Sequence, residues 1–337
     1  MKILIREGSA AKNLDSLAPL LNYYPGEVML CTDDLHPEML AKGHINKIVA
    51  RLIKMGYDLF NVVRAASVNT AEHYLINTGF LREGDAADFI LVDDPAKMNV
   101  LQTWIDGQLV YDGDKALFSP GIVKKVNKFK CTRLLTDEIR VPNEGGKIRV
   151  IVAENGSLMT GSGEAPAGEE EFINPRLDED ILKIVVKERY NDRPPSVGFI
   201  EGFGLKKGAM ASSVAHDSHN IIAVGTNDRD IVAAINLIIE AEGGMSAVSD
   251  EGSDILKLPV AGIMSDMPVT AMAGRYERLS ETVKSFGSRL DAPYMTLSFM
   301  ALLVIPRLKL SDRGLFDGLA FRHVPLFIQK QYPGQKS

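Results

Sequence analysis

Two aspartates stand together directly after an apolar run. Residues 27–31, EVMLC, read as a short buried strand that ends on Asp33 and Asp34. The carboxyl end of a parallel strand is where barrel enzymes hold metal ions and general bases. A carboxylate here can also cap a turn that leads into a helix beginning at His36 and Pro37. The spacing leaves both interpretations of the two aspartates open.

A second polar cluster interrupts an apolar stretch. Residues 215–220, AHDSHN, contain His216, Asp217, His219 and Asn220. Two histidines three residues apart can share a metal ion on one face of a helix, but they point to opposite sides of a strand. The apolar residues 221–224 favour a strand, which disfavours the shared metal. The cluster is then either a hydrogen-bonded strand end or the polar wall of a pocket.

The first part of the chain predicts the elements that position the aspartates. Residues 2–7 and 27–31 read as strands, and residues 14–21 carry leucines at helical spacing, which together predict a parallel strand, helix, strand unit. Residues 45–75 predict two helices broken near Gly56.

The rest of the chain predicts a small β stretch and then a second domain. Residues 89–92 read as a strand, and Asp106-Gly107 marks the turn of a hairpin. We place a boundary near residues 143–147. Strand and helix patterns alternate after it, which indicates an α/β or α+β domain.

Composition narrows the classes of function. The chain has 337 residues and a net charge of -6, so we expect two domains or three, and small molecules or proteins rather than nucleic acid as partners. Cys31 and Cys131 form no CxxC motif, which suits the cytoplasm. We find no signal peptide and no apolar run of membrane-spanning length. HxH, HExxH, GxSxG and Walker motifs are also absent.

Several motifs, in order, resemble a known family. REGSAAKNL at 6–14, CTDDLHPEML at 31–40, GHIN at 43–46 and GFLREGDAADFILVDD at 79–94 resemble the end of the metal-dependent amidohydrolase barrel, in the adenine deaminase family. AHDSHNIIAVGTND at 215–228, LPVAGIMSD at 258–266 and residues 295–317 resemble the extra C-terminal domain of that family. The resemblance implies an α/β chain in three parts: the last strands and helices of the barrel at 1–76, a small β-sandwich segment with a connector at 77–145, and the C-terminal domain at 146–337.

The resemblance also implies a reaction and its residues. Adenine would be deaminated to hypoxanthine by hydroxide at a centre of two manganese or iron ions. Asp33 would bind a metal ion and carry the proton from the nucleophile to the leaving amine. Three substrate-binding residues are then expected at the mouth of the barrel: Arg6, Glu7 and Asp34. Three residues of the second cluster are expected to help close the purine pocket: His216, Asp217 and His219. We also expect a homo-oligomer.

The chain departs from that family in length. A complete barrel takes about 250 residues, and the residues before the β stretch have room for two strands only. The HxH motif and the other metal ligands have no counterpart in the sequence. We expect a late start codon, a split gene whose other chain supplies the rest of the barrel, or a decayed remnant. Such a remnant would expose the apolar faces of Ile3, Ile5, Val28 and Leu30.

Two other functions compete with deamination. A hydantoinase-like hydrolase would share residues 79–94, although the C-terminal domain disfavours it. A purine-binding or assembly module without catalysis is supported by the missing metal ligands.

Overall fold

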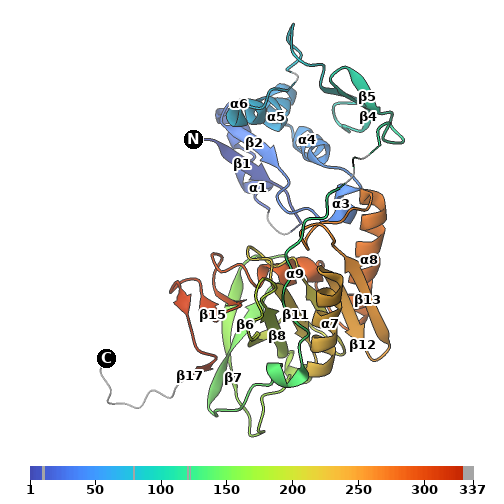
Figure 1. Ribbon diagram of the computed structural model, residues 1–337. Coiled ribbons are helices and arrows are strands. Elements are labelled where there is room, and N and C mark those ends of the chain that lie inside the picture. Colours follow the sequence, from blue (N-terminus) through green and yellow to red (C-terminus); the bar gives the residue numbers. More distant parts are fainter. Residues whose placement is uncertain (10–11, 79, 120, 122, 329–337) are drawn as a thin grey trace. The chain divides into compact units, whose positions relative to one another are not determined.

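The computed structural model describes residues 1–9, 12–78, 80–119, 121 and 123–328 (Figure 1). The chain separates into two compact units, Met1–Ile122 and Val123–Ser337, and each is described by itself. The proposed division into 1–76, 77–145 and 146–337 stays a prediction. None of the helices in the described part of the chain has the length and apolarity needed to span a lipid bilayer.

The first unit combines short strands with short helices. Its elements are β1 (Ile3–Arg6), α1 (Leu14–Leu17), α2 (Leu20–Tyr23), β2 (Val28–Cys31), α3 (Pro37–Leu40), α4 (Ile45–Lys54), α5 (Leu59–Ala66), α6 (Val68–Tyr74), β3 (Phe89–Val92), β4 (Val100–Ile105) and β5 (Gln108–Tyr111). Strands β1 and β2 pair in parallel, as predicted, with Arg6 opposite Cys31. The predicted intervening helix is split in two at Pro19, a residue that disfavours a helix interior.

Helices cover one face of this strand pair. Ile5, Val28 and Leu30 are buried against a shared core to which α1, α2, α4 and α5 contribute Leu14, Leu21, Leu52 and Val62 among others. The prediction that these three strand residues are exposed is therefore wrong, because the short helices of the same unit pack over them. Leu4, on the other face of β1, keeps 41% of its surface exposed.

Residues 45–75 form three helices instead of the predicted two. The break near Gly56 is confirmed, since Gly56 has a φ of 93° and Asp58 caps α5 by accepting the N–H of Asn61 at 2.9 Å. The backbone leaves helical geometry again at Ser67, which has a φ of -137° and separates α5 from α6.

The predicted hairpin is confirmed. Strands β4 and β5 are antiparallel, and both Asp106 and Gly107 have positive φ angles, of 49° and 72°, as a two-residue hairpin turn requires. With β3 they form a three-stranded sheet. Over the described residues of 77–145 this is one layer, so the sandwich itself stays a prediction.

The second unit is built on one large sheet. Its elements are the 3-10 helices η1 (Thr136–Ile139) and η2 (Leu177–Glu179), the helices α7 (Asp228–Ala241), α8 (Val269–Ser285) and α9 (Pro293–Phe299), and the strands β6 (Lys147–Ala153), β7 (Thr160–Pro166), β8 (Leu182–Lys187), β9 (Ser196–Glu201), β10 (Ala209–Ser212), β11 (Ile221–Gly225), β12 (Gly244–Ser249), β13 (Gly252–Lys257), β14 (Leu308–Ser311), β15 (Gly314–Asp317), β16 (Arg322–His323) and β17 (Phe327–Ile328). Nine of the described strands form this sheet, in the order β13, β12, β10, β11, β8, β9, β6, β17, with β7 also on β6.

Most neighbouring strands in this sheet are antiparallel, and β6 with β9 is the parallel pair among those described. The architecture is mixed α/β. The sequence predicted either an α/β or an α+β arrangement for this domain, and the observed sheet fits the α+β arrangement. The reason is that hairpins, rather than helices, join most successive strands. Helix α7 packs on β10, β11 and β12 (Figure 1), and the strands β8 and β11 are buried along their whole length.

The segment before η1 belongs to the second unit. The N–H of Lys130 donates to the carbonyl of Arg189 at 2.8 Å. Asn236 on α7 then bonds both backbone groups of Leu134, accepting from its N–H at 2.8 Å and donating to its carbonyl at 3.0 Å. These bonds fix residues 130–134 on the large sheet's domain.

Candidate functional site

Asp33 follows β2 and is paired with an arginine. Its Oδ2 accepts a hydrogen bond from Nη1 of Arg6 at 2.6 Å, and its Oδ1 accepts the N–H of Asp34 at 2.8 Å. Asp33 thus closes the turn after the strand, with a φ of 54°. It does not cap helix α3, whose first residue is Pro37 and whose preceding residue His36 makes no side-chain cap.

The register of the strands brings Arg6 to Asp33. Arg6 lies opposite Cys31, two residues before Asp33, so the two side chains extend from adjacent strand ends. The loops that follow the strands are also joined. Ser9 donates its N–H to the carbonyl of Asp34 at 2.9 Å and accepts the N–H of His36 on its Oγ at 2.9 Å.

Glu7 lines a cavity of about 270 Å³ beside the strand ends. Thr32 after β2, residues of α3 and α4, and residues of the loops on either side of α3 complete its wall. Nη1 of Arg51 donates to Oε1 of Glu7 at 2.6 Å, and its Nη2 donates to Asp15 at 2.7 Å. The Glu7 side chain is 23% exposed, so its carboxylate is partly open to a ligand while Arg51 fixes its direction.

Sequence reasoning missed Arg51 and the role of His44. Nε2 of His44 lies 3.2 Å from Oγ1 of Thr32, the buried residue that precedes Asp33. Arg51 lies on α4 and His44 lies directly before it, so both are far along the chain from the strands that they support. Their charge and their hydrogen-bonding atoms were visible in the sequence, but no local spacing linked them to Glu7 or Thr32.

The described residues of this unit do not fit a metal ion. Over the part of the chain that the structure describes, no group of three or more His, Cys, Asp and Glu side chains could hold one. Asp33 is bound by Arg6, and His36 lies 3.2 Å from Glu38 through its Nδ1. Burial raises the pKa of the Cys31 thiol, which disfavours the thiolate that binds metals.

The second polar cluster forms a turn between β10 and β11. The prediction of a strand is confirmed for Ile221–Gly225 and wrong for the histidines, because the N–H of His219 donates back to the carbonyl of Ala215 at 2.6 Å. The two imidazoles consequently do not point to opposite sides. Their centroids are 5.7 Å apart, and the ring of His216 stacks on Phe299 at 4.8 Å.

Two neighbouring side chains hold this turn. The hydroxyl of Tyr190 donates to the carbonyl of Ser218 at 2.9 Å, and Nη2 of Arg189 donates to that hydroxyl at 3.0 Å. The N–H of Arg189 also bonds Oδ1 of Asn220 at 3.4 Å. Arg189 is 4% exposed. Neither residue is predicted from the sequence, where a charged residue at the end of an apolar strand is the available signal.

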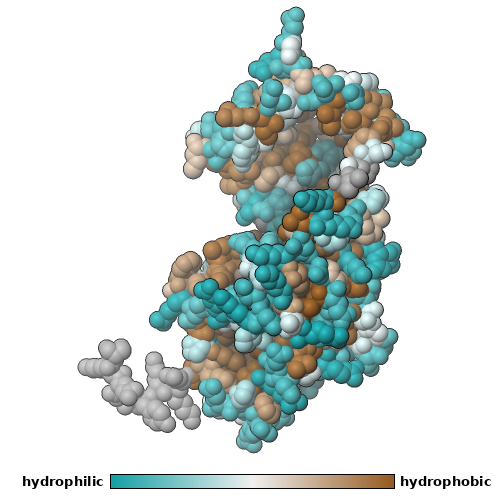
Figure 2. Space-filling view, in the orientation of Figure 1, coloured by the Kyte–Doolittle hydropathy of each residue, from teal (hydrophilic) through white to brown (hydrophobic). Residues whose placement is uncertain are grey.

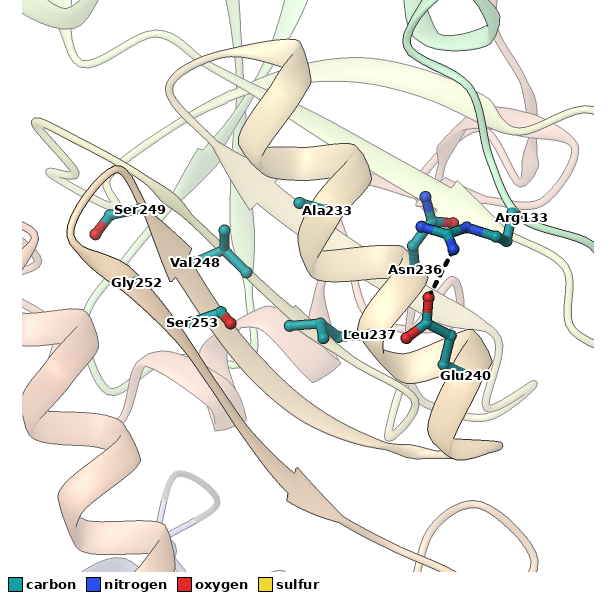
Figure 3. Close-up of a pocket in the computed structure, with 9 residues that line it drawn as sticks. All are labelled: Arg133, Ala233, Asn236, Leu237, Glu240, Val248, Ser249, Gly252 and Ser253. Carbon is teal, nitrogen blue, oxygen red and sulfur yellow. Dashed lines mark ion pairs between the residues drawn. The ribbon is translucent and has the colours of Figure 1, made fainter.

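A larger hollow in the second unit contains none of the predicted residues. It measures about 460 Å³ and lies between α7 and the turn that joins β12 to β13 (Figure 3). Arg133 and Glu240 form an ion pair of 3.0 Å at its rim, but their side chains are 69% and 51% exposed. The side chain of Asn236 is already hydrogen-bonded to both backbone groups of Leu134. The residues that line this hollow do not form a catalytic arrangement.

Arg6, Glu7, Asp33 and Asp34 thus belong to the first unit, and His216, Asp217 and His219 belong to the second. Within the first unit, Arg6 contacts Asp33, which bonds the N–H of Asp34, and Glu7 is bound separately by Arg51. Hydrophobic and hydrophilic side chains are mixed over the visible face of each unit (Figure 2).

Two family models match the chain. The amidohydrolase family matches residues 3–110, and the adenine deaminase C-terminal domain matches residues 157–322. The amidohydrolase match implies a metal cofactor, although the described residues do not form its site.

Curated relatives match almost the whole chain. The adenine deaminase of Salinibacter ruber is 48% identical over 331 residues, which are 97% of this chain and 61% of that protein. Those of Methanosarcina acetivorans and Sulfurovum sp. are 49% and 51% identical and are covered over 62% and 60% of their length. The chain therefore spans about three fifths of the relatives it matches. Residues 3–110 are thus similar to the amidohydrolase family, and residues 157–322 are similar to adenine deaminase C-terminal domains.

Proposed function

We propose that this chain is part of an adenine deaminase. In the reaction, the oxygen of water bonds to C6 of adenine, the bond from C6 to the exocyclic nitrogen breaks, and hypoxanthine and ammonia leave. The observation that carries the proposal is the match to adenine deaminases at 48% identity over 97% of the chain. The match to the C-terminal domain of that enzyme also disfavours the hydantoinase-like alternative.

Asp33 is our candidate for moving the proton. As a carboxylate at the end of a parallel strand, it would take a proton from the attacking water on one oxygen and return it to the leaving nitrogen. Arg6 supports this role because its Nη1 donates to Oδ2 of Asp33 at 2.6 Å and so fixes the direction of the carboxylate. Asp34, next along the turn, is proposed to bind substrate with Arg6.

Glu7 is proposed to hydrogen-bond the purine ring. Its contact with Arg51 supports this, because a carboxylate whose direction is fixed loses less freedom when it binds a ligand. For His216, Asp217 and His219 we also propose contacts with the purine. The stacking of His216 on Phe299 supports this, since it holds an imidazole plane in one orientation.

The complete enzyme needs more than the described residues. We propose that manganese or iron is held there by ligands from outside them, including a second amidohydrolase segment on the same or another chain. Strands β1 and β2 support this, because among the described strands each pairs only with the other and keeps one edge for a further strand. We also propose that the protein forms a homo-oligomer. The two free cysteines support a further proposal, a cytoplasmic location.

A non-catalytic purine-binding or assembly module is the second candidate. The observation that favours it is the hydrogen bond from Arg6 to Asp33, which occupies one oxygen of the proposed catalytic carboxylate.

Ammonia release separates the two candidates. The chain is assayed with adenine and Mn²⁺, alone and mixed with the part of the Salinibacter ruber protein that it does not match. Activity in the mixture that is lost in Asp33→Asn supports the deaminase. Adenine binding by the chain with no activity in either preparation supports the module.

A further inference from the structure

The cavity beside the ends of β1 and β2 carries more positive than negative charge. Of the described residues that line it, Lys42, Lys47 and Arg51 are basic, and one is acidic, Glu7. Arg51 donates to Glu7 at 2.6 Å and to Asp15 at 2.7 Å, so these two carboxylates balance its charge. The charges of Lys42 and Lys47 are not balanced by an acid of the lining. The cavity therefore favours a ligand with a negative group.

The ammonium groups of Lys42 and Lys47 lie at an exposed rim and keep donors for such a ligand. Nζ of Lys47 donates to Oδ1 of Asn99 at 3.1 Å, which uses one of its three N–H donors. The stem of Lys47 lies over Gly43, where an added Cβ would be 2.5 Å from the Lys47 Cγ. Burial raises the pKa of Glu38, and the charge of Lys42 is among the contacts that lower it below its usual value. Lys42 is thus partly offset by an acid, whereas Lys47 is held by a neutral amide.

The rest of the cavity offers apolar walls and one fixed acceptor. Leu35, Met39 and Ile48 line the same space, which measures about 270 Å³. Sites for small molecules combine such walls with a few polar groups that fix the orientation of the ligand. Here the carboxylate of Glu7, directed by Arg51, can accept an N–H from the ligand. The combination fits a flat heterocycle that donates an N–H and carries an anionic group.

We propose that this cavity binds a purine nucleotide, with the base against the apolar side chains and Glu7 and the phosphate against Lys42 and Lys47. For the base, this rests on the proposed function, in which Glu7 contacts the purine ring. For the phosphate, it rests on the two lysines alone. Because the base takes the same place in both ligands, the nucleotide competes with adenine for the cavity.

The test compares adenosine monophosphate (AMP) with adenosine, which lacks the phosphate, by calorimetric titration of the full chain. We expect AMP to bind at least about tenfold more tightly, because the hydrogen bonds from the lysines to the phosphate are charge-assisted. The double variant Lys42→Met/Lys47→Met should bind AMP as weakly as adenosine and should bind adenosine as the wild type does. Lys54→Met/Lys115→Met removes the same charge from the same unit outside the cavity, and should keep the preference for AMP. Raising the salt from about 0.05 M to about 0.5 M should reduce the preference in the wild type.

Three results would overturn the proposal. The first is AMP that binds no more tightly than adenosine, or not at all. The second is a preference for AMP that persists in Lys42→Met/Lys47→Met. The third is inorganic phosphate that binds as tightly as AMP, because the cavity would then recognise no base. None of these measurements uses turnover, so their failure leaves the proposed deaminase to be judged by ammonia release. A chain that prefers AMP through the two lysines and releases no ammonia supports this proposal and contradicts the deaminase.

Discussion

Arg51 joins two carboxylates that are distant in the sequence. It donates to Glu7 at 2.6 Å and to Asp15 at 2.7 Å, and so ties helix α4 to the end of β1 and to helix α1. Because the Arg51 side chain is 41% exposed, we discount its ion pairs for screening by water and salt.

Replacing Arg51 should weaken the first unit. We expect Arg51→Met to lower the free energy of unfolding by about 1 kcal/mol, because Glu7 and Asp15 each lose a charged hydrogen bond. Urea denaturation measures the change. Lys54→Met, at the exposed end of the same helix, is the matched control and should stay within about 0.5 kcal/mol of the wild type. Equal effects of the two substitutions would contradict the role of Arg51.

Burial of Cys131 predicts a dependence of stability on pH. Burial raises the pKa of its thiol from 9.0 to about 11. The unfolded chain therefore releases the thiol proton at lower pH than the folded chain, and the stability present below pH 9 is lost as the pH rises towards 11. We expect the wild type to lose about 2 kcal/mol more than Cys131→Ala over this window. Parallel pH profiles for the two proteins would refute this.

The fold was predictable where the signal was local. Asp106-Gly107 between two apolar strands fixes a turn type, and Asp58 after Gly56 marks a helix start, so both features follow from neighbouring residues. The turn at His216–His219 was mistaken for a strand because its apolar flanks belong to strands on both sides.

The candidate site was predictable only in part. Asp33 and Glu7 could be placed at strand ends, but their partners depend on packing. Arg51 reaches Glu7 across 44 positions of sequence, and periodicity carries no information at that range. The burial of Ile5 was likewise decided by which helices of the same unit pack on it.

The turn at residues 215–220 should respond to the loss of one hydroxyl. Tyr190→Phe removes the 2.9 Å hydrogen bond to the carbonyl of Ser218. We expect the amide NMR signals of this turn to shift and broaden, and, in an active mixture, the KM for adenine to rise more than kcat falls. Tyr111→Phe removes a comparable bond, of 2.8 Å to Gly113, in the other unit and is the control. If both variants leave the turn signals in place, Tyr190 does not hold the turn.

The open edge of β1 offers a test of strand pairing. The N–H of Ile3 donates to the carbonyl of Glu27, directly before β2, and the N–H of Glu7 donates to the carbonyl of Cys31 in β2, so the N–H of Leu4 faces the other edge. Leu4→Pro removes this N–H, whereas Leu4→Ala keeps it. We expect Leu4→Pro to weaken binding to the unmatched part of the Salinibacter ruber protein at least about tenfold more than Leu4→Ala. Calorimetric titration measures both, and equal affinities would argue against pairing at this edge.

The most direct test of the account is the rate at which adenine becomes hypoxanthine in the mixture of this chain with that unmatched part, in the presence of Mn²⁺. The account predicts turnover in the mixture, a loss of at least about 100-fold in Asp33→Asn, and no loss in Asp312→Asn, an aspartate of the second unit outside the proposed site. Undiminished turnover in Asp33→Asn would contradict the account. So would an absence of turnover in a wild-type mixture that is shown to form a complex.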